Sequence, residues 1–113
     1  MQIRLFVSDR ESRTEALRTL IDEAVAEAGL PDVEIEVVTV RGDDEARRLH
    51  SLGSPTIRVD GSDIEYAERE PSETTAGGRF YSTARGWQPM PERGMIVFAI
   101  REAQQRAARR RDG

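Results

Sequence analysis

The chain of 113 residues contains no cysteine, and it also lacks lysine and asparagine. Without a thiol it can form no disulfide, no thiolate nucleophile and no cysteine-based metal site. All 17 basic residues are therefore arginine. A bias of this breadth points to GC-rich codon usage rather than to selection at one binding site.

Long apolar runs are absent as well. No stretch approaches the roughly 20 residues that a membrane-spanning helix requires. Nor does the chain begin with the basic and apolar regions of a signal peptide. We therefore expect a cytoplasmic protein that does not enter a membrane. The net charge of −4 argues against bulk attraction to nucleic acid or to anionic lipid.

The apolar residues that are present, 37% of the chain, fall into periodic blocks that predict regular structure. Alternation predicts strands at 1–7, 33–40, 56–59 and 64–66, the last two forming a hairpin around Asp60-Gly61. Helical spacing predicts helices at 12–29, at 43–52 and from Pro91 onward. Ser12 and Glu15 have the spacing of a capping box, and either Asp43 or Asp44 is expected to cap the second helix.

These elements follow one another in the order β-α-β-α-β-β-α. The first two strands, joined across a helix, form a right-handed parallel unit, and the hairpin adds antiparallel strands. We thus predict a single α/β domain over 1–113 with a central mixed four-stranded sheet flanked by helices, the arrangement of thioredoxin-like domains. A long polar loop at 67–89 and a frayed tail at 106–113 complete the prediction.

Two motifs stand out. Leu52-Gly53-Ser54-Pro55-Thr56 leads into an aliphatic strand and an Asp-Gly turn, and Arg79-Phe80-Tyr81 comes later, ahead of Pro91. In these motifs, and over almost its whole length, the chain resembles a family of small bacterial thioredoxin-like proteins, some of whose members are selenoproteins. The resemblance implies a thioredoxin-like fold in which Pro55 is a cis-proline.

The resemblance also implies two redox positions, and this chain has a thiol at neither. One position precedes the Arg-aromatic-Tyr motif, where the chain has Gly78, and the other falls at about Arg10. Neither residue can replace a thiolate, which alone combines strong nucleophilicity with a reversible bond to sulfur. A nearby serine would need an activating base. The resemblance therefore implies the fold without the thiol–disulfide activity, and we expect no cofactor.

The motif around Pro55 has two interpretations. In the first, which we favour, Pro55 with its neighbours Ser54 and Thr56 fixes the turn into the strand. In the second, Pro55 shapes a groove in which an extended peptide or a partner strand docks.

The loop from Ser8 to Ser12 also has two interpretations. Arg10 and Ser12 would hold a small anion at the start of the first helix. The simpler interpretation is that Ser12 caps this helix while its neighbours are solvated, and we prefer it.

Phe80, Tyr81 and Trp87 lie in an otherwise polar segment. Aromatic side chains are costly to leave in water, so they either fold this segment over the sheet or form a patch for a partner, such as a second copy of the chain. We expect the residues around Arg79-Phe80-Tyr81 to be ordered against the domain or at a homodimer interface, and Glu68–Gly77 to be looser.

The remaining polar features predict no site. His50 is the only histidine, so a histidine-based metal site or a Ser-His-Asp triad has no basis in the sequence. We place it at the end of the second helix, where a positive charge is favourable. Four arginines near the end of the chain suit the dipole of the last helix better than nucleic acid: Arg106, Arg109, Arg110 and Arg111.

The sequence as a whole predicts a non-catalytic thioredoxin-like domain that uses the Pro55 side and the aromatic segment to bind. Its partner is an unidentified protein or peptide, or a second copy of the chain. The alternatives are an enzyme with non-thiol chemistry or a small-anion site at 8–12, and a thiol oxidoreductase scaffold whose cysteines have been lost or replaced.

Overall fold

A mixed four-stranded sheet lies at the centre of the computed structural model, which describes residues 1–112, with side chains as far as Arg111. β1 pairs in parallel with β2 and antiparallel with β4, and β5 extends the sheet antiparallel to β4. A central mixed sheet is what the sequence predicts. In spatial order its strands are β2 (Glu34–Val40), β1 (Gln2–Ser8), β4 (Thr56–Val59) and β5 (Ser62–Asp63).

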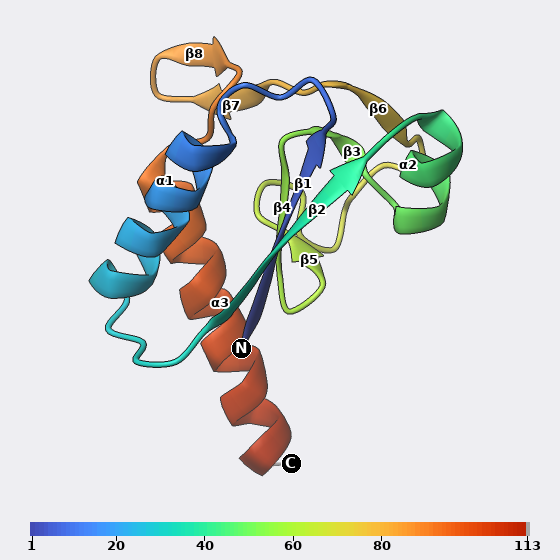
Figure 1. The fold of residues 1–113 in the computed structure, drawn as a ribbon. Helices are drawn as coiled ribbons and strands as arrows, with labels where there is room; N and C mark the ends of the chain where they lie inside the picture. The colour runs from blue at the N-terminus through green and yellow to red at the C-terminus, as the bar shows by residue number, and fades with distance from the viewer. Residues whose placement is uncertain (113) are drawn as a thin grey trace.

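Helices flank this sheet on both faces (Figure 1). Alternation along β1 explains the two layers, because Ile3 and Leu5 pack into the larger core with the first and last helices. Phe6 points the other way and packs against Ala46 of the middle helix. The sheet therefore buries residues on both sides. The helices are α1 (Thr14–Glu27), α2 (Asp43–Leu49) and α3 (Arg93–Asp112).

Three short strands interrupt the segment predicted as a loop at 67–89. β6 pairs in parallel with a strand just before Pro55, and β7 forms a hairpin with β8. The prediction of a loop is wrong for these residues because Thr-Ala-Gly-Gly has no alternation by which to recognise a strand. The additional strands are β3 (Leu52–Ser54), β6 (Thr75–Gly78), β7 (Tyr81–Thr83) and β8 (Gly86–Gln88).

The predicted helix starts need correction. α1 begins at Thr14, and no side chain caps it, so the capping box of Ser12 is wrong. α2 likewise lacks a side-chain cap, because Gly42 precedes it and Asp43 bonds elsewhere. α3 begins two residues after Pro91, at Arg93.

Two predicted ends also differ. The second strand of the hairpin is Ser62–Asp63 rather than 64–66, because the chain turns again at Ile64. The described part of the expected frayed tail, 106–112, is helical and continues α3, while Gly113 lies outside the described residues.

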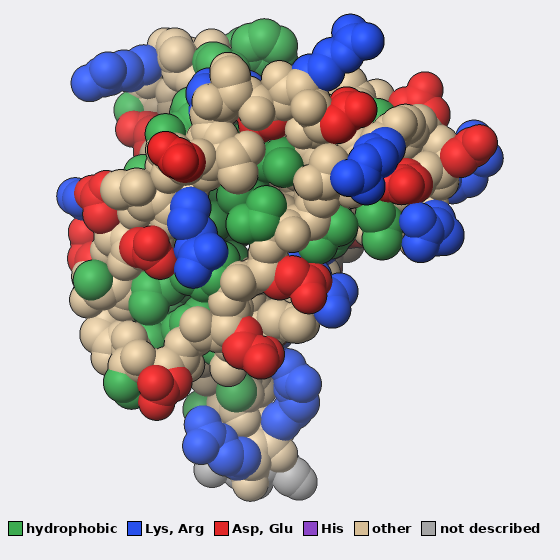
Figure 2. Space-filling model, viewed as in Figure 1, with side chains coloured by type: hydrophobic (Ala, Val, Ile, Leu, Met, Phe, Trp, Pro, Cys, Tyr) green, Lys and Arg blue, Asp and Glu red, His purple; other side chains and the backbone are tan. Residues whose placement is uncertain are grey.

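The surface carries charged side chains of both signs over the face shown in Figure 2, with arginine prominent near the end of α3. Among the helices described over residues 1–112, none is long and apolar enough to cross a membrane.

Candidate functional site

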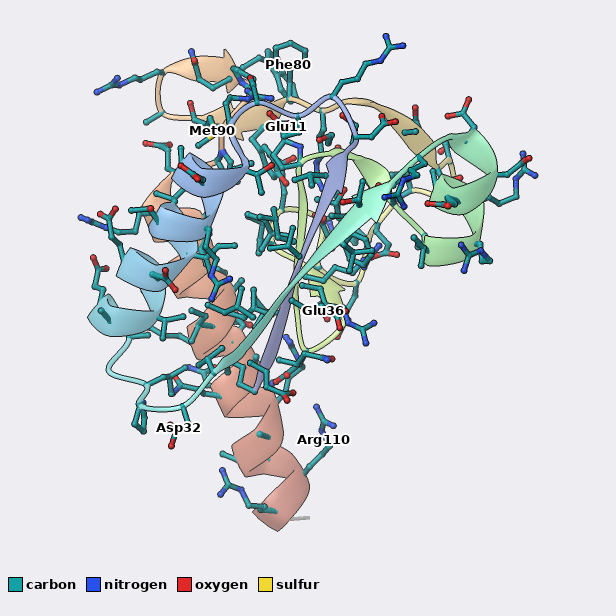
Figure 3. The ribbon with its side chains drawn as sticks, in the orientation of Figure 1. Glu11, Asp32, Glu36, Phe80, Met90 and Arg110 are labelled. Carbon is teal, nitrogen blue, oxygen red and sulfur yellow. The ribbon has the colours of Figure 1, made fainter. Side chains whose placement is uncertain are left out.

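The sequence motifs meet at one end of the sheet, around Ser54. The Ser54 carbonyl oxygen accepts a hydrogen bond from the Arg79 amide at 2.9 Å, and Ser54 Oγ accepts one from the Ser8 amide at 2.9 Å. The peptide bond between Ser54 and Pro55 is cis. Figure 3 shows Glu11 and Phe80 at this same end, where the loop after β1 passes the segment between β6 and β7. We call this region the Ser54 site.

Glu11 is the residue of the Ser8–Ser12 loop that contacts Ser54. Its side chain is only 4% exposed. Glu11 Oε1 accepts hydrogen bonds from Ser54 Oγ at 2.9 Å and from Arg13 Nη2 at 3.0 Å, and Oε2 accepts from Arg13 Nε at 2.8 Å and from the Arg13 amide at 3.1 Å. The hydrogen bonds from Arg13 lower the pKa of Glu11 to about 2, so the group is a carboxylate at neutral pH.

This carboxylate bears on the two alternatives for the Ser8–Ser12 loop. An anion at the start of α1 would face Glu11, while Arg10 and Ser12 are both exposed. The pairing of Ser54 Oγ with Glu11 resembles a nucleophile beside a base. A carboxylate with a pKa near 2 is a poor base at neutral pH, however, and both of its oxygens are already bonded. The geometry therefore argues against an anion site and against serine-based catalysis.

Arg79 points inward, with only 6% of its surface exposed. Its Nη1 and Nη2 donate to Asp63 Oδ1 at 2.6 Å and Oδ2 at 2.8 Å. The guanidinium carbon also lies 4.2 Å from the centroid of the Tyr81 ring, within range of a cation–π interaction. Burial, the largest single influence, raises the pKa of Asp63, but Arg79 together with the amides of Tyr66 and Glu65 holds it below its ordinary value. The pair links β5 to the end of β6.

Tyr81 is fully buried and fixes the segment a second time. Its hydroxyl donates to the carbonyl oxygen of Pro55 at 2.6 Å, and burial raises its pKa above the ordinary value. Next to Pro55, Thr56 Oγ1 donates to the Gly53 carbonyl oxygen at 2.6 Å. Arg79 and Tyr81 thus lie against the domain, one of the two arrangements predicted for them.

Gly53 allows β3 and β6 to approach each other closely. Its φ of +116° lies in the region that favours glycine, and a Cβ at this position would lie 2.8 Å from Arg79 Cβ. Ser54, Pro55 and Thr56 are all buried under this contact. The edge of β3 that leads into Pro55 is therefore covered by β6, which leaves no open groove there for another strand.

Phe80 and Trp87, which we call the outer aromatics, are 57% and 68% exposed. Figure 3 shows Phe80 directed away from the body of the domain. Among the three aromatic residues of this segment, packing within one chain therefore accounts for Tyr81 alone.

The sequence analysis did not identify two residues of the site, Glu11 and Asp63. Glu11 and Asp63 hold the arginines of the site, yet each is one of several acids in or near a turn, where solvated acids are common. One signal for Asp63 was available, since a carboxylate that precedes the apolar Ile64 in an aliphatic hairpin has a natural partner in the arginine of the Arg79-Phe80-Tyr81 motif.

His50 lies outside the Ser54 site, and a pocket adjoins the site at Asp63. His50 ends α2, and its Nε2 lies 2.9 Å from Glu70 Oε1, which also bonds Arg58. A pocket of about 110 Å³ lies between β5 and α3, with Ile64 and Phe98 in its walls. The pocket contains none of the residues predicted for binding.

The chemistry of the Ser54 site consists of hydroxyl groups and of carboxylates paired with arginine. Within residues 1–112, no three His, Asp or Glu side chains are grouped so that they could hold a metal ion. Comparison of the chain with protein-family models, with curated proteins and with solved structures gave no match.

Proposed function

We propose that this chain is a non-catalytic domain of the thioredoxin-like type that binds a protein or peptide over the Ser54 site. One contrast carries the proposal. Arg79 and Tyr81 are held inward, whereas Phe80 between them is 57% exposed. A firmly held segment that presents an aromatic ring to water leaves a free-energy cost that a partner covering the ring removes.

The thioredoxin-like type is supported by the β-α-β order at the start of the chain, by the antiparallel strands that follow and by the helices on both faces of the mixed sheet. The absence of catalysis is supported by the residues at the two redox positions of the family. Gly78 has no side chain, and Arg10 is exposed while its neighbour Glu11 is held by Arg13.

The binding surface lies on the outer side of β6 rather than in a groove beside Pro55. β6 already occupies the edge of β3, and Pro55 itself is buried. Of the residues predicted for binding here, Gly78 and the outer aromatics are exposed, and Thr75 and Gly77 of β6 are exposed beside them. This surface adjoins both motifs that carry the family resemblance.

A peptide library displayed on phage and selected against the immobilised protein tests the proposal. We expect enriched peptides that bind the wild type and lose binding at least tenfold to Phe80→Ser. The matched control is Phe98→Ser, since Phe98 on α3 is an equally exposed phenylalanine at 65%. Enriched peptides that bind all three proteins equally, or no enrichment, would contradict a binding role for this surface.

The second arm of the test addresses catalysis. We expect the protein to leave the rate of insulin reduction by dithiothreitol at the level of a buffer blank. A rate above that blank would overturn the non-catalytic assignment and favour chemistry that the site geometry does not suggest.

A further inference from the structure

The outer edge of β6 is open. In the described part of the chain, β6 pairs with β3 and with no other strand. The Arg79 amide bonds Ser54, so Arg79 faces β3. Because the backbone groups of alternate residues point to opposite sides of a strand, those of Gly78, at the end of β6, face outward, and we extend the same alternation to Phe80, two residues further on. Two sets of N–H and C=O groups therefore stand beside the exposed ring of Phe80.

Gly78 is not required by the fold. A Cβ at this position would meet nothing within 4 Å, and its φ lies outside the left-handed range. Glycine weakens a strand, and where the fold does not demand it, it often marks the close approach of another backbone. Unlike Gly53, Gly78 has room for a side chain, as Gly94 does, but among these glycines Gly78 lies at the open edge of β6.

We infer that a second copy of this chain pairs antiparallel with this edge, about a two-fold axis at Arg79. This inference rests on the proposed function and names the partner. In this register Gly78 lies opposite the partner's Phe80, and Phe80 lies opposite the partner's Gly78. Each ring then covers a glycine, a cross-strand combination that stabilises edge glycines. The spacing Gly78-Arg79-Phe80 makes the edge self-complementary.

The structure selects this register over its neighbour. A pairing centred on Gly78 would require the amide of Ala76, but that amide already donates to Asp43 Oδ1 at 3.0 Å. Asp43 therefore ends the open edge on the side of α2 and confines pairing to Gly78 and Phe80.

Charge favours the same arrangement. Arg79 is neutralised internally by Asp63, so the paired residues bring no like charges together. α2 lies at the start of β6 and the β7–β8 hairpin lies beyond its end (Figure 1). The two-fold axis directs the acidic first turn of α2, with Asp43 and Asp44, toward the hairpin that bears the exposed Arg85 of the partner subunit. The edge of β2, in contrast, carries the exposed Glu34, which would repel the same residue of a second copy, while Glu36 is paired with Arg4.

The cysteine-free chain allows a direct test of the register. Opposite residues of an antiparallel pair have Cα atoms about 5.5 Å apart, within the span of a disulfide. We would mix Gly78→Cys with Phe80→Cys, so that the crosslinked pair retains one Phe80 ring over one Gly78. Under mild oxidation we expect the mixed disulfide to form several-fold above its statistical share. Ala108→Cys, at an exposed position on α3, is the control for random collision.

Sedimentation of the uncrosslinked proteins completes the test. We expect a concentration-dependent dimer for the wild type and for Phe98→Ser, and a monomer for Phe80→Ser. A wild type that remains monomeric from micromolar to millimolar concentration, or a mixed disulfide at its statistical share, would overturn the inference. If library peptides still bind through Phe80 in that case, the proposed function stands and only the identity of the partner fails. If Phe80→Ser changes neither peptide binding nor dimer formation, both the proposed function and this inference fail.

Discussion

Arg79 and Phe80 are neighbours in the chain, yet the charged residue is 6% exposed and the aromatic one 57%. Polarity alone would reverse these values. Arg79 can be buried because Asp63 presents two carboxylate oxygens in the geometry of its guanidinium, and because Tyr81 offers the face of its ring. The comparison teaches that the availability of a matching partner decides burial here, and that Phe80 has no such partner among the residues that the structure describes.

A second ion pair extends the comparison. Arg13 and Glu11 form the same type of two-bond contact, but they are two residues apart and Arg13 keeps 34% of its side chain exposed. In the Arg79–Asp63 pair the exposed fractions are 4% and 0%. We therefore expect the inner pair to affect stability more strongly than the outer one, and the exposed ring to affect it least.

Arg79→Met should have the largest effect, because it leaves the Asp63 carboxylate buried without a cation. We expect the free energy of unfolding to fall by about 3–5 kcal/mol, measured by urea denaturation. Arg85→Met, at an exposed position, is the matched control and should change it by less than about 0.5 kcal/mol. The double variant with Asp63→Asn should regain part of the loss. An unchanged urea midpoint for Arg79→Met would show that the pair contributes nothing.

Protonation of Glu11 should lower the free energy of unfolding in acid. Its pKa is about 2 in the folded chain and ordinarily 4.5, so its contribution is complete above about pH 4.5 and is lost as the pH falls toward 2. We expect a loss of about 2 kcal/mol, after allowing for the partial exposure of Arg13. Urea denaturation across this range would show a smaller loss for Glu11→Gln. Equal pH dependence in both proteins would assign the effect to other acids.

Tyr81→Phe removes one hydrogen bond without removing the ring. The carbonyl oxygen of Pro55 then loses its donor in a buried setting, and we expect a loss of about 1–2 kcal/mol in the free energy of unfolding. Tyr66→Phe is the control, because the Tyr66 ring is 36% exposed. If the two variants have the same stability, the hydroxyl of Tyr81 has no special role in holding the segment.

Phe80→Ser should have the smallest effect on the stability of a dilute, monomeric sample. An exposed ring contributes little to folding, so we expect a change within about 0.5 kcal/mol in urea denaturation. A loss well above this would mean that the ring packs against its own domain, and the contrast with Arg79 would disappear.

The sequence predicts the parts of this fold in which apolar residues repeat. Ile3 and Leu5 alternate in β1, and Leu17 and Ile21 mark the buried face of α1. β6 could not be predicted in this way, because a strand of small residues that pairs through its backbone leaves no periodic trace. Its partner β3 is equally short and contains Gly53.

The sequence analysis named some residues of the candidate site but not the contacts between them. The family resemblance pointed to Pro55 and to Arg79, while Asp63 and Glu11 remained unnoticed because pairing between distant segments is decided by tertiary geometry. Likewise, sequence alone treats Phe80 and Tyr81 as equivalent aromatic residues, and only the direction of the chain at Arg79 places one inside and one outside.

The Arg79–Asp63 pair also determines how the outer segment can move. Asp63 belongs to the central sheet, whereas Arg79 belongs to the segment that follows β6. When this segment lifts from the sheet, both charges return to water together and regain their hydration. The variant Arg79→Met, in contrast, leaves the Asp63 carboxylate buried without a cation. The ion pair by itself therefore opposes local opening of 75–88 less than the substitution at Arg79 suggests, and the burial of Tyr81 supplies the rest of the resistance. The segment can be well ordered and still exchange its amide hydrogens while the sheet beneath it stays folded.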